Sequence, residues 1–354
     1  MRILKLDGLR GIFSLMIVFF HYDPRILPNF LGENFIVRQS WIFVEFFFVL
    51  SGYVISFNYS KIETIEVLKT FVKKRFIRLY PLLLFSTLLF FLFESFSNVF
   101  LINHINSPES VGSLFYKTID TLFLTNSTPI FGNGGGMNGP SWSISSEMIS
   151  YLVFGVIIFI FQPKYRSLIF IFIVLLSGFF QFTLGDLDLD LSFLRGTLSF
   201  SLGVLLYKII NLKFRVPNYF ELIIPIIVIW SMYLINLESE FNKIHKIITI
   251  NFVFFVSIGI LLKTNGFISK FLEKGFIQYL GKISYSIYLN HLIIITIFSR
   301  SIFSLMKIDQ TIISQLLVFI ISIVLVLFYS NFTFKNIEFK IGRFLKNILL
   351  TKPT

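Results

Sequence analysis

Two ionisable residues, Arg10 and His21, lie in the first apolar segment of the chain, Leu6–Tyr22. Only uncharged residues separate them, and both side chains are costly to place in hydrocarbon, so each is a candidate functional group. Eleven residues make three helical turns, which would put both on nearly the same face, about 16 Å apart along the axis. That face would hold a fixed cation at one depth and a proton-transfer group at another. The alternative is an N-terminal anchor whose two polar groups extend to opposite interfaces.

A second polar group occupies the segment Pro140–Glu147. Proline favours the first turn of a helix, which would place Glu147 about two turns into the membrane, with Ser143 one turn before it on the same face. The helix dipole stabilises a carboxylate only within the first turn, so Glu147 needs another partner. We expect that partner to be His21, because a histidine oriented by a carboxylate is suited to drawing a proton from a hydroxyl group.

Arg75 and Arg78 are three residues apart and would share a helix face. Paired guanidinium groups match the geometry of phosphate oxygens. The same pair is equally consistent with the ordinary excess of positive charge at the cytoplasmic end of a span.

Ser284, Tyr288 and His291 follow the spacing i, i+4, i+7, which predicts one polar stripe towards the interior of a helical bundle. Hydrogen bonding between helices is the better explanation for Ser284 and Tyr288, whereas His291 is a candidate site residue. Glu338, near two lysines, is expected to form a surface ion pair. His104 and His245 have no polar cluster around them, and no His, Asp and Glu grouping has metal-ligand spacing.

The composition predicts an integral membrane protein. Of the 354 residues 55% are hydrophobic and 14% are charged, whereas soluble domains carry about 25% charged residues. We expect a single membrane domain over residues 1–354, without a soluble domain. The chain has no Cys, which excludes a disulfide framework, a thiol nucleophile and a cysteine metal site.

The fold class that we predict is all-α, a polytopic transmembrane bundle of about ten spans with both termini cytoplasmic. The expected spans are 8–24, 41–58, 78–96, 141–161, 167–184, 193–210, 219–236, 247–263, 281–300 and 312–333. This topology puts 23 of the 31 Lys and Arg residues on the inner side and 8 on the outer side, as the positive-inside rule requires. The net charge of +12 then reflects topology and anionic lipid rather than a nucleic-acid surface.

Two connections between the expected spans are distinctive. The outer connection 97–140 contains a semi-apolar middle, Val111–Leu124, and a glycine cluster, Gly132–Gly136. It suits a substrate-facing loop or re-entrant element, and simple tethering is an equal alternative. The inner connection 59–78 ends in the basic run that contains Arg75 and Arg78.

Taken together, these segments resemble the membrane acyltransferase family 3, bacterial inner-membrane enzymes that modify sugars and other cell-surface molecules. The matching features are LDGLRG followed by His21, the aromatic segment Val44–Tyr53, Arg75 and Arg78 before Leu79-Tyr80-Pro81, Trp142-Ser143 with Glu147, and the Ser284–His291 stripe. They follow the family order over nearly the whole chain. The chain departs at Tyr53, where phenylalanine is frequent, and at Ser146, where a bulkier residue is common.

The resemblance implies transfer of an acyl group, most simply acetyl, from cytosolic acyl-coenzyme A to a hydroxyl of a surface carbohydrate or lipid-linked glycan. Acyl-coenzyme A would be a co-substrate, with no permanently bound cofactor and no metal. Membrane lipid and glycan-biosynthesis enzymes are the other expected partners, and nucleic acid is not one. The location implied is the bacterial inner membrane, with the acceptor at its outer face.

In this hypothesis Arg75 and Arg78 bind coenzyme A phosphates at the cytoplasmic mouth, and Arg10 lines the route or orients the thioester. His21 and Glu147 are the catalytic pair, with Arg10 assisting. The candidate substrate-binding residues are Trp142, Ser143, Tyr288 and His291. Direct attack by the acceptor is our first choice and an acyl-histidine intermediate is the alternative. An exporter of polysaccharide or lipid-linked sugar is the competing function.

Overall fold

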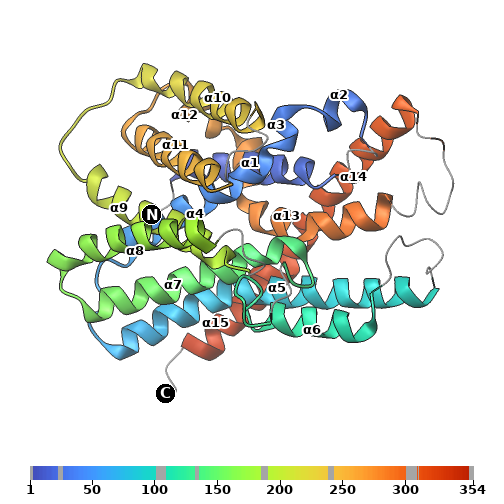
Figure 1. Ribbon diagram of the computed structural model, residues 1–354, viewed down its shortest axis with the longest axis horizontal. Coiled ribbons are helices and arrows are strands. Elements are labelled where there is room, and N and C mark those ends of the chain that lie inside the picture. The colour runs from blue at the N-terminus through green and yellow to red at the C-terminus, as the bar shows by residue number, and fades with distance from the viewer. Residues whose placement is uncertain are drawn as a thin grey trace.

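The computed structural model describes residues 3–22, 27–100, 109–131, 135–184, 190–237, 243–299, 309 and 311–350. Every regular element in these ranges is a helix, and most of the long helices run side by side (Figure 1). The all-α fold class is therefore confirmed.

The helices of the bundle are α1 (Leu4–Phe20), α4 (Phe43–Asn58), α5 (Ile65–Phe100), α6 (Val111–Leu122), α7 (Trp142–Ile160), α8 (Pro163–Leu184), α9 (Ser192–Ile210), α10 (Ile223–Leu237), α11 (Lys243–Lys263), α13 (Gly275–Ser299) and α14 (Ile312–Thr333). Short helices are α2 (Asn29–Gly32), α3 (Phe35–Arg38), α12 (Phe267–Leu272) and α15 (Gly342–Leu350). The other short segments are the 3₁₀ turns η1 (Ser40–Ile42), η3 (Gly139–Ser141) and η4 (Asn218–Leu222), and the π-helical η6 (Phe334–Ile341).

Nine helical segments in the described ranges are long and apolar enough to cross a membrane. The remaining expected span is α1, which has 17 residues. At about 1.5 Å per residue it is slightly shorter than a hydrocarbon core of about 30 Å. The polytopic bundle is confirmed, and the count of ten spans depends on α1.

The helix that contains the third expected span begins well before that span. α5 starts at Ile65, not at residue 78, and continues for 36 residues. The expected connection 59–78 is therefore mostly helix, and Arg75 and Arg78 lie well inside α5. Lys and Arg have high helix propensity, so a basic run does not by itself end a helix.

The connection 97–140 contains a helix of its own. α6 forms its semi-apolar middle and lies beside α5 (Figure 1). Residues 132–134 of the glycine cluster, and His104, fall outside the described residues. Gly135 and Gly136 have φ angles of 86° and 67°, a backbone conformation that glycine adopts readily.

Glycines bring the helices of the site into backbone contact. A Cβ atom on Gly11 of α1 would lie 2.5 Å from a backbone nitrogen of α13, and one on Gly281 of α13 would lie 2.1 Å from a backbone oxygen of α1. α4 and α9 cross in the same way at Gly52 and Gly203, where a Cβ would lie 2.0 and 1.9 Å from an opposing carbonyl oxygen. Small residues permit such close packing of membrane helices, and these two crossings position α1, α4, α9 and α13.

Candidate active site

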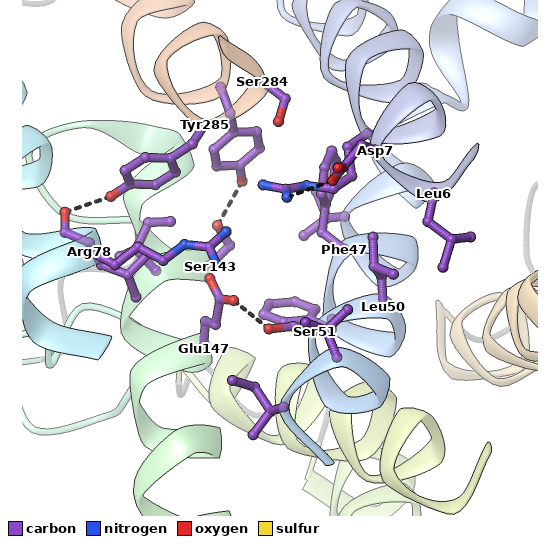
Figure 2. A pocket seen from close by; sticks show the side chains of 18 of the residues that line it. Leu6, Asp7, Phe47, Leu50, Ser51, Arg78, Ser143, Glu147, Ser284 and Tyr285 are labelled. Atoms are coloured by element: carbon purple, nitrogen blue, oxygen red, sulfur yellow. Dashed lines mark hydrogen bonds and ion pairs between the residues drawn. The ribbon is translucent and has the colours of Figure 1, made fainter. Parts of the chain in front are cut away.

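One cavity of about 200 Å³ lies between α1, α4, α5, α7 and α13, and we name it the arginine cavity. Its charged and hydroxyl lining includes Asp7, Arg10, Ser51, Arg78, Ser143 and Glu147. Figure 2 shows Arg78 and Glu147 reaching into the same space, with Asp7 on the opposite wall. The cavity therefore unites groups that are far apart in sequence, two guanidinium groups among them.

Glu147 is held by hydroxyl groups in this cavity. Its Oε1 accepts hydrogen bonds from Ser51 Oγ, at 2.6 Å, and from the hydroxyl of Tyr151 (Figure 2 draws the first). The expected pairing of Glu147 with His21 is therefore wrong. Counting turns from Pro140 estimates depth along α7, but it does not fix the direction in which the carboxylate points.

Only one residue of the arginine pair lines the cavity. Arg78 does so, and it makes no hydrogen bond or ion pair within the described part of the chain. Arg75 packs between the rings of Tyr59 and Tyr151, with its guanidinium carbon 5.3 and 5.9 Å from their centroids. It also donates a hydrogen bond of 3.2 Å to the Tyr59 hydroxyl. Sharing a helix face did not bring the two side chains to one site.

A second cavity, of about 340 Å³, adjoins the first, and we name it the histidine cavity. Its polar and aromatic lining includes Phe20, His21, Trp41, Trp142, Arg195 and Tyr288. Val44 and Tyr288 line both cavities, so they form the wall between them. His21, at the C-terminal cap of α1, thus lies in one cavity while Arg10 lies in the other.

His21 pairs with His291. His21 Nδ1 lies 2.9 Å from the carbonyl oxygen of Ile17 and 3.1 Å from His291 Nε2. His291, which is completely buried, places its own Nδ1 3.2 Å from the carbonyl oxygen of Ile287. Carbonyl oxygens can only accept, so a neutral pair carries a proton on each Nδ1, and His291 Nε2 accepts from His21.

This hydrogen-bond pattern leaves Nε2 of His21 as an unprotonated nitrogen. It has no partner among the described residues, and its side chain lines the histidine cavity. A fixed imidazole with a free Nε2 lone pair is the arrangement that a general base requires.

The predicted stripe on α13 is buried, as expected: Ser284, Tyr288 and His291 are 1%, 7% and 0% exposed. The Tyr288 hydroxyl lies 2.8 Å from Ser143 Oγ and donates to the carbonyl oxygen of Pro140 at 3.1 Å. Tyr288 thereby fastens α13 to the beginning of α7 at the wall between the cavities.

A family model described as an acyltransferase domain, acyltransferase 3, matches residues 3–330. The chain belongs to this family. It is also similar to protein 2 in the picA locus of Rhizobium radiobacter, with 39% identity over 83 residues, which are 23% of this chain and 40% of that protein. The chain therefore matches less than half the length of that relative, and no solved structure matches it. Family membership and the apolar helices together indicate a multi-pass membrane protein of the acyltransferase 3 family.

The chain contains a buried charged pair that the sequence analysis did not select. Glu45 of α4 is completely buried and accepts a hydrogen bond from Nε of Arg195 in α9. Both lie within apolar helices, so the argument from the cost of intramembrane charge that selected Arg10 would have found them. Trp41, which also lines the histidine cavity, was missed as well.

Glu338 does not form the expected surface ion pair with the neighbouring lysines. It is half-buried in η6, and its Oε2 accepts a hydrogen bond of 2.9 Å from Ser286 of α13. Its neighbour Lys340 bonds instead to Asn336. The π-helical turn redirects the side chains of this segment, which a regular α-helical period does not anticipate. Within the described ranges no group of three or more His, Asp or Glu side chains could hold a metal.

Proposed function

We propose that the protein transfers an acyl group, acetyl in the simplest case, from cytosolic acyl-coenzyme A to a hydroxyl of a surface carbohydrate or lipid-linked glycan. The proposal places it in the bacterial inner membrane, with both termini cytoplasmic and the acceptor at the outer face. Activated thioesters are made in the cytosol and surface glycans mature outside, so the reaction must bridge the bilayer.

The observation that carries the proposal is the position of His21 Nε2. This nitrogen has no partner among the described residues, and its side chain lines a cavity that shares a wall with the arginine cavity. A donor entering through the arginine cavity and an acceptor in the histidine cavity would meet near Val44 and Tyr288. Arg10 and His21 are about 16 Å apart along α1, which is of the order of a pantetheine arm.

In the arginine cavity we assign donor binding to Arg78 and Arg10. Guanidinium groups suit phosphate oxygens, and the terminal groups of Arg78 have no partner in the described part of the chain that would keep them from binding one. Arg75 supports Tyr151, which in turn donates to Glu147. Glu147 balances the two cations and keeps a positioning role in donor binding.

In the histidine cavity the acceptor hydroxyl loses its proton to His21 Nε2 as its oxygen attacks the thioester carbonyl carbon. His291 accepts from Nδ1 and stabilises the imidazolium that forms. The carbon–sulfur bond then breaks, and the imidazolium returns the proton to the departing coenzyme A thiolate. The products are the acyl ester and free coenzyme A.

An acyl-histidine intermediate is the alternative route, because the same Nε2 lone pair could attack the thioester first. The two routes differ in whether labelled acyl group attaches to the protein when the acceptor is absent. Acyl label trapped on His21 would select the two-step route.

The test uses inside-out membrane vesicles supplied with acetyl-coenzyme A labelled in the acetyl group. Acyl transfer predicts release of free coenzyme A and label in the glycan or lipid-linked fraction, with neither in vesicles that carry His21→Ala. Export, the competing function, predicts movement of glycan without a gain in mass or use of acetyl-coenzyme A. Movement without label would refute the proposal.

A further inference from the structure

The wall of the histidine cavity contains a fixed arginine that the reaction as described does not use. Arg195 is in the first turn of α9 and lines the cavity together with His21. Its Nε donates to Glu45, and 15% of its side-chain surface is exposed whereas Glu45 has none.

Two indole rings hold the guanidinium of Arg195. Its central carbon lies 5.0 Å from the ring of Trp41 and 4.9 Å from the ring of Trp142, both within the range of cation–π attraction. Trp41 is itself oriented, since its Nε1 donates a hydrogen bond of 3.0 Å to Gln39. The guanidinium plane is therefore fixed from three sides.

The remaining donors of Arg195 are unused. A guanidinium has five N–H groups, and Nε uses one of them. The two terminal amino groups make no hydrogen bond among the described residues, although the side chain lines the cavity. Because Glu45 and two indole rings hold the guanidinium while its side chain stays partly exposed at the cavity, the terminal amino groups are available to a ligand there.

We propose that Arg195 binds the acceptor, which rests on the acyl-transfer function proposed above. Its terminal amino groups donate hydrogen bonds to adjacent ring or hydroxyl oxygens of a sugar, and so hold one hydroxyl at His21 Nε2. The cavity of about 340 Å³ is in the size range of small-molecule sites. Glu45 is a positioning residue that acts through Arg195.

The Glu45–Arg195 pair also indicates the charge of the acceptor. Glu45 neutralises the guanidinium, and the histidine cavity has no further cation in its described lining. The site therefore favours the neutral oxygens of a sugar over a carboxylate or phosphate, which would place an unbalanced negative charge beside Glu45.

The chain provides its own reporter for this site. It has three tryptophans, and two of them flank Arg195. The third, Trp230, is 59% exposed on α10 and can be removed as Trp230→Phe. This background protein in lipid nanodiscs, free of sugar detergents, is titrated with methyl β-D-glucopyranoside, methyl β-D-galactopyranoside and methyl β-D-glucuronide while tryptophan emission is recorded.

We expect a saturable response to at least one neutral glycoside, and a weaker one to the glucuronide. Arg195→Lys keeps the charge opposite Glu45 but loses the planar fork, and it should raise the apparent dissociation constant by about 10-fold or more. The matched control is Arg343→Lys, because Arg343 also stacks on an aromatic ring, Phe339, but is exposed and outside both cavities. It should leave the sugar response unchanged.

Calorimetry with coenzyme A separates the two proposals and verifies that Arg195→Lys is folded, since this variant should bind coenzyme A as the parent does. An equal sugar response in parent and Arg195→Lys overturns the acceptor site while leaving acyl transfer intact. A flat response to all three glycosides, or tighter binding of the glucuronide, also overturns it. Sugar binding that depends on Arg195, without coenzyme A binding or turnover, supports the sugar site and refutes the proposed function.

Discussion

The arginine cavity and the histidine cavity share a wall but hold their charged groups in opposite ways. In the arginine cavity Arg78 has no ion pair within the described residues, and Arg10 has only a long one, 3.5 Å, to Asp7. In the histidine cavity both charged or titratable groups are held by a second residue. His21 is hydrogen-bonded to His291, and Arg195 is paired with Glu45.

The difference corresponds to two kinds of task. Cations that are not already paired are free to bind a mobile anionic ligand such as a phosphate. Groups that are fixed by their neighbours lose little conformational entropy when a substrate binds, so they are suited to positioning reacting atoms. We therefore expect substitutions in the arginine cavity to change the Michaelis constant for acyl-coenzyme A, and those in the histidine cavity to change turnover.

His21→Ala should have the largest effect. Removing a general base lowers turnover by about 100- to 10,000-fold. Acylation in membrane vesicles, normalised to the amount of protein inserted, is the measurement. If the His21→Ala variant is present at normal abundance and acylates at the parental rate, the reaction does not take place in the histidine cavity.

His291→Gln should lower turnover by roughly 10- to 100-fold, the cost of one hydrogen bond to a charged group. The Michaelis constant for acyl-coenzyme A should change little, because His291 acts through His21. If His291 had only a structural role, its replacement would not alter the pH profile of turnover. If it is the partner of His21, its loss should shift that profile along the pH axis. Glu147→Gln is the control, and an equal displacement in that variant would return Glu147 to the role that we first expected.

Arg78→Ala should raise the Michaelis constant for acyl-coenzyme A by roughly 10- to 100-fold with a smaller change in turnover. Titration of acyl-coenzyme A at saturating acceptor measures both constants. A fall in turnover at an unchanged Michaelis constant would remove the functional distinction between the two cavities.

Arg75→Ala should have the smallest effect on the donor, about two- to five-fold in the Michaelis constant, because it loses cation–π contacts rather than a ligand contact. Its main consequence should be lower thermal stability in detergent. Arg75 and Arg78 are the same residue type on the same helix, and only Arg78 lines the cavity. If both alanine variants lost the same affinity for acyl-coenzyme A, a position at the cavity would not explain the role of Arg78.

The sequence was informative wherever a residue type is costly in a membrane. Arg10, His21, Glu147 and His291 were selected on that basis, and each lines a cavity or contacts a residue that does. The all-α fold and most span positions followed from the lengths of apolar runs. Burial cost and hydrophobic length depend on local composition, so the chain itself reveals them.

Pairing could not be predicted in this way. Glu147 bonds to Ser51 and Tyr151, while His21 bonds to His291, 270 residues away. Helix rotation and crossing decide which side chains meet, and the backbone contacts at Gly11 and Gly281 fix them for α1 and α13, which carry His21 and His291. The sequence by itself determined which groups needed a partner and roughly how deep they lie. Only the tertiary structure decided which residues are the partners, because packing against other helices determines the direction in which each side chain points around its helix axis.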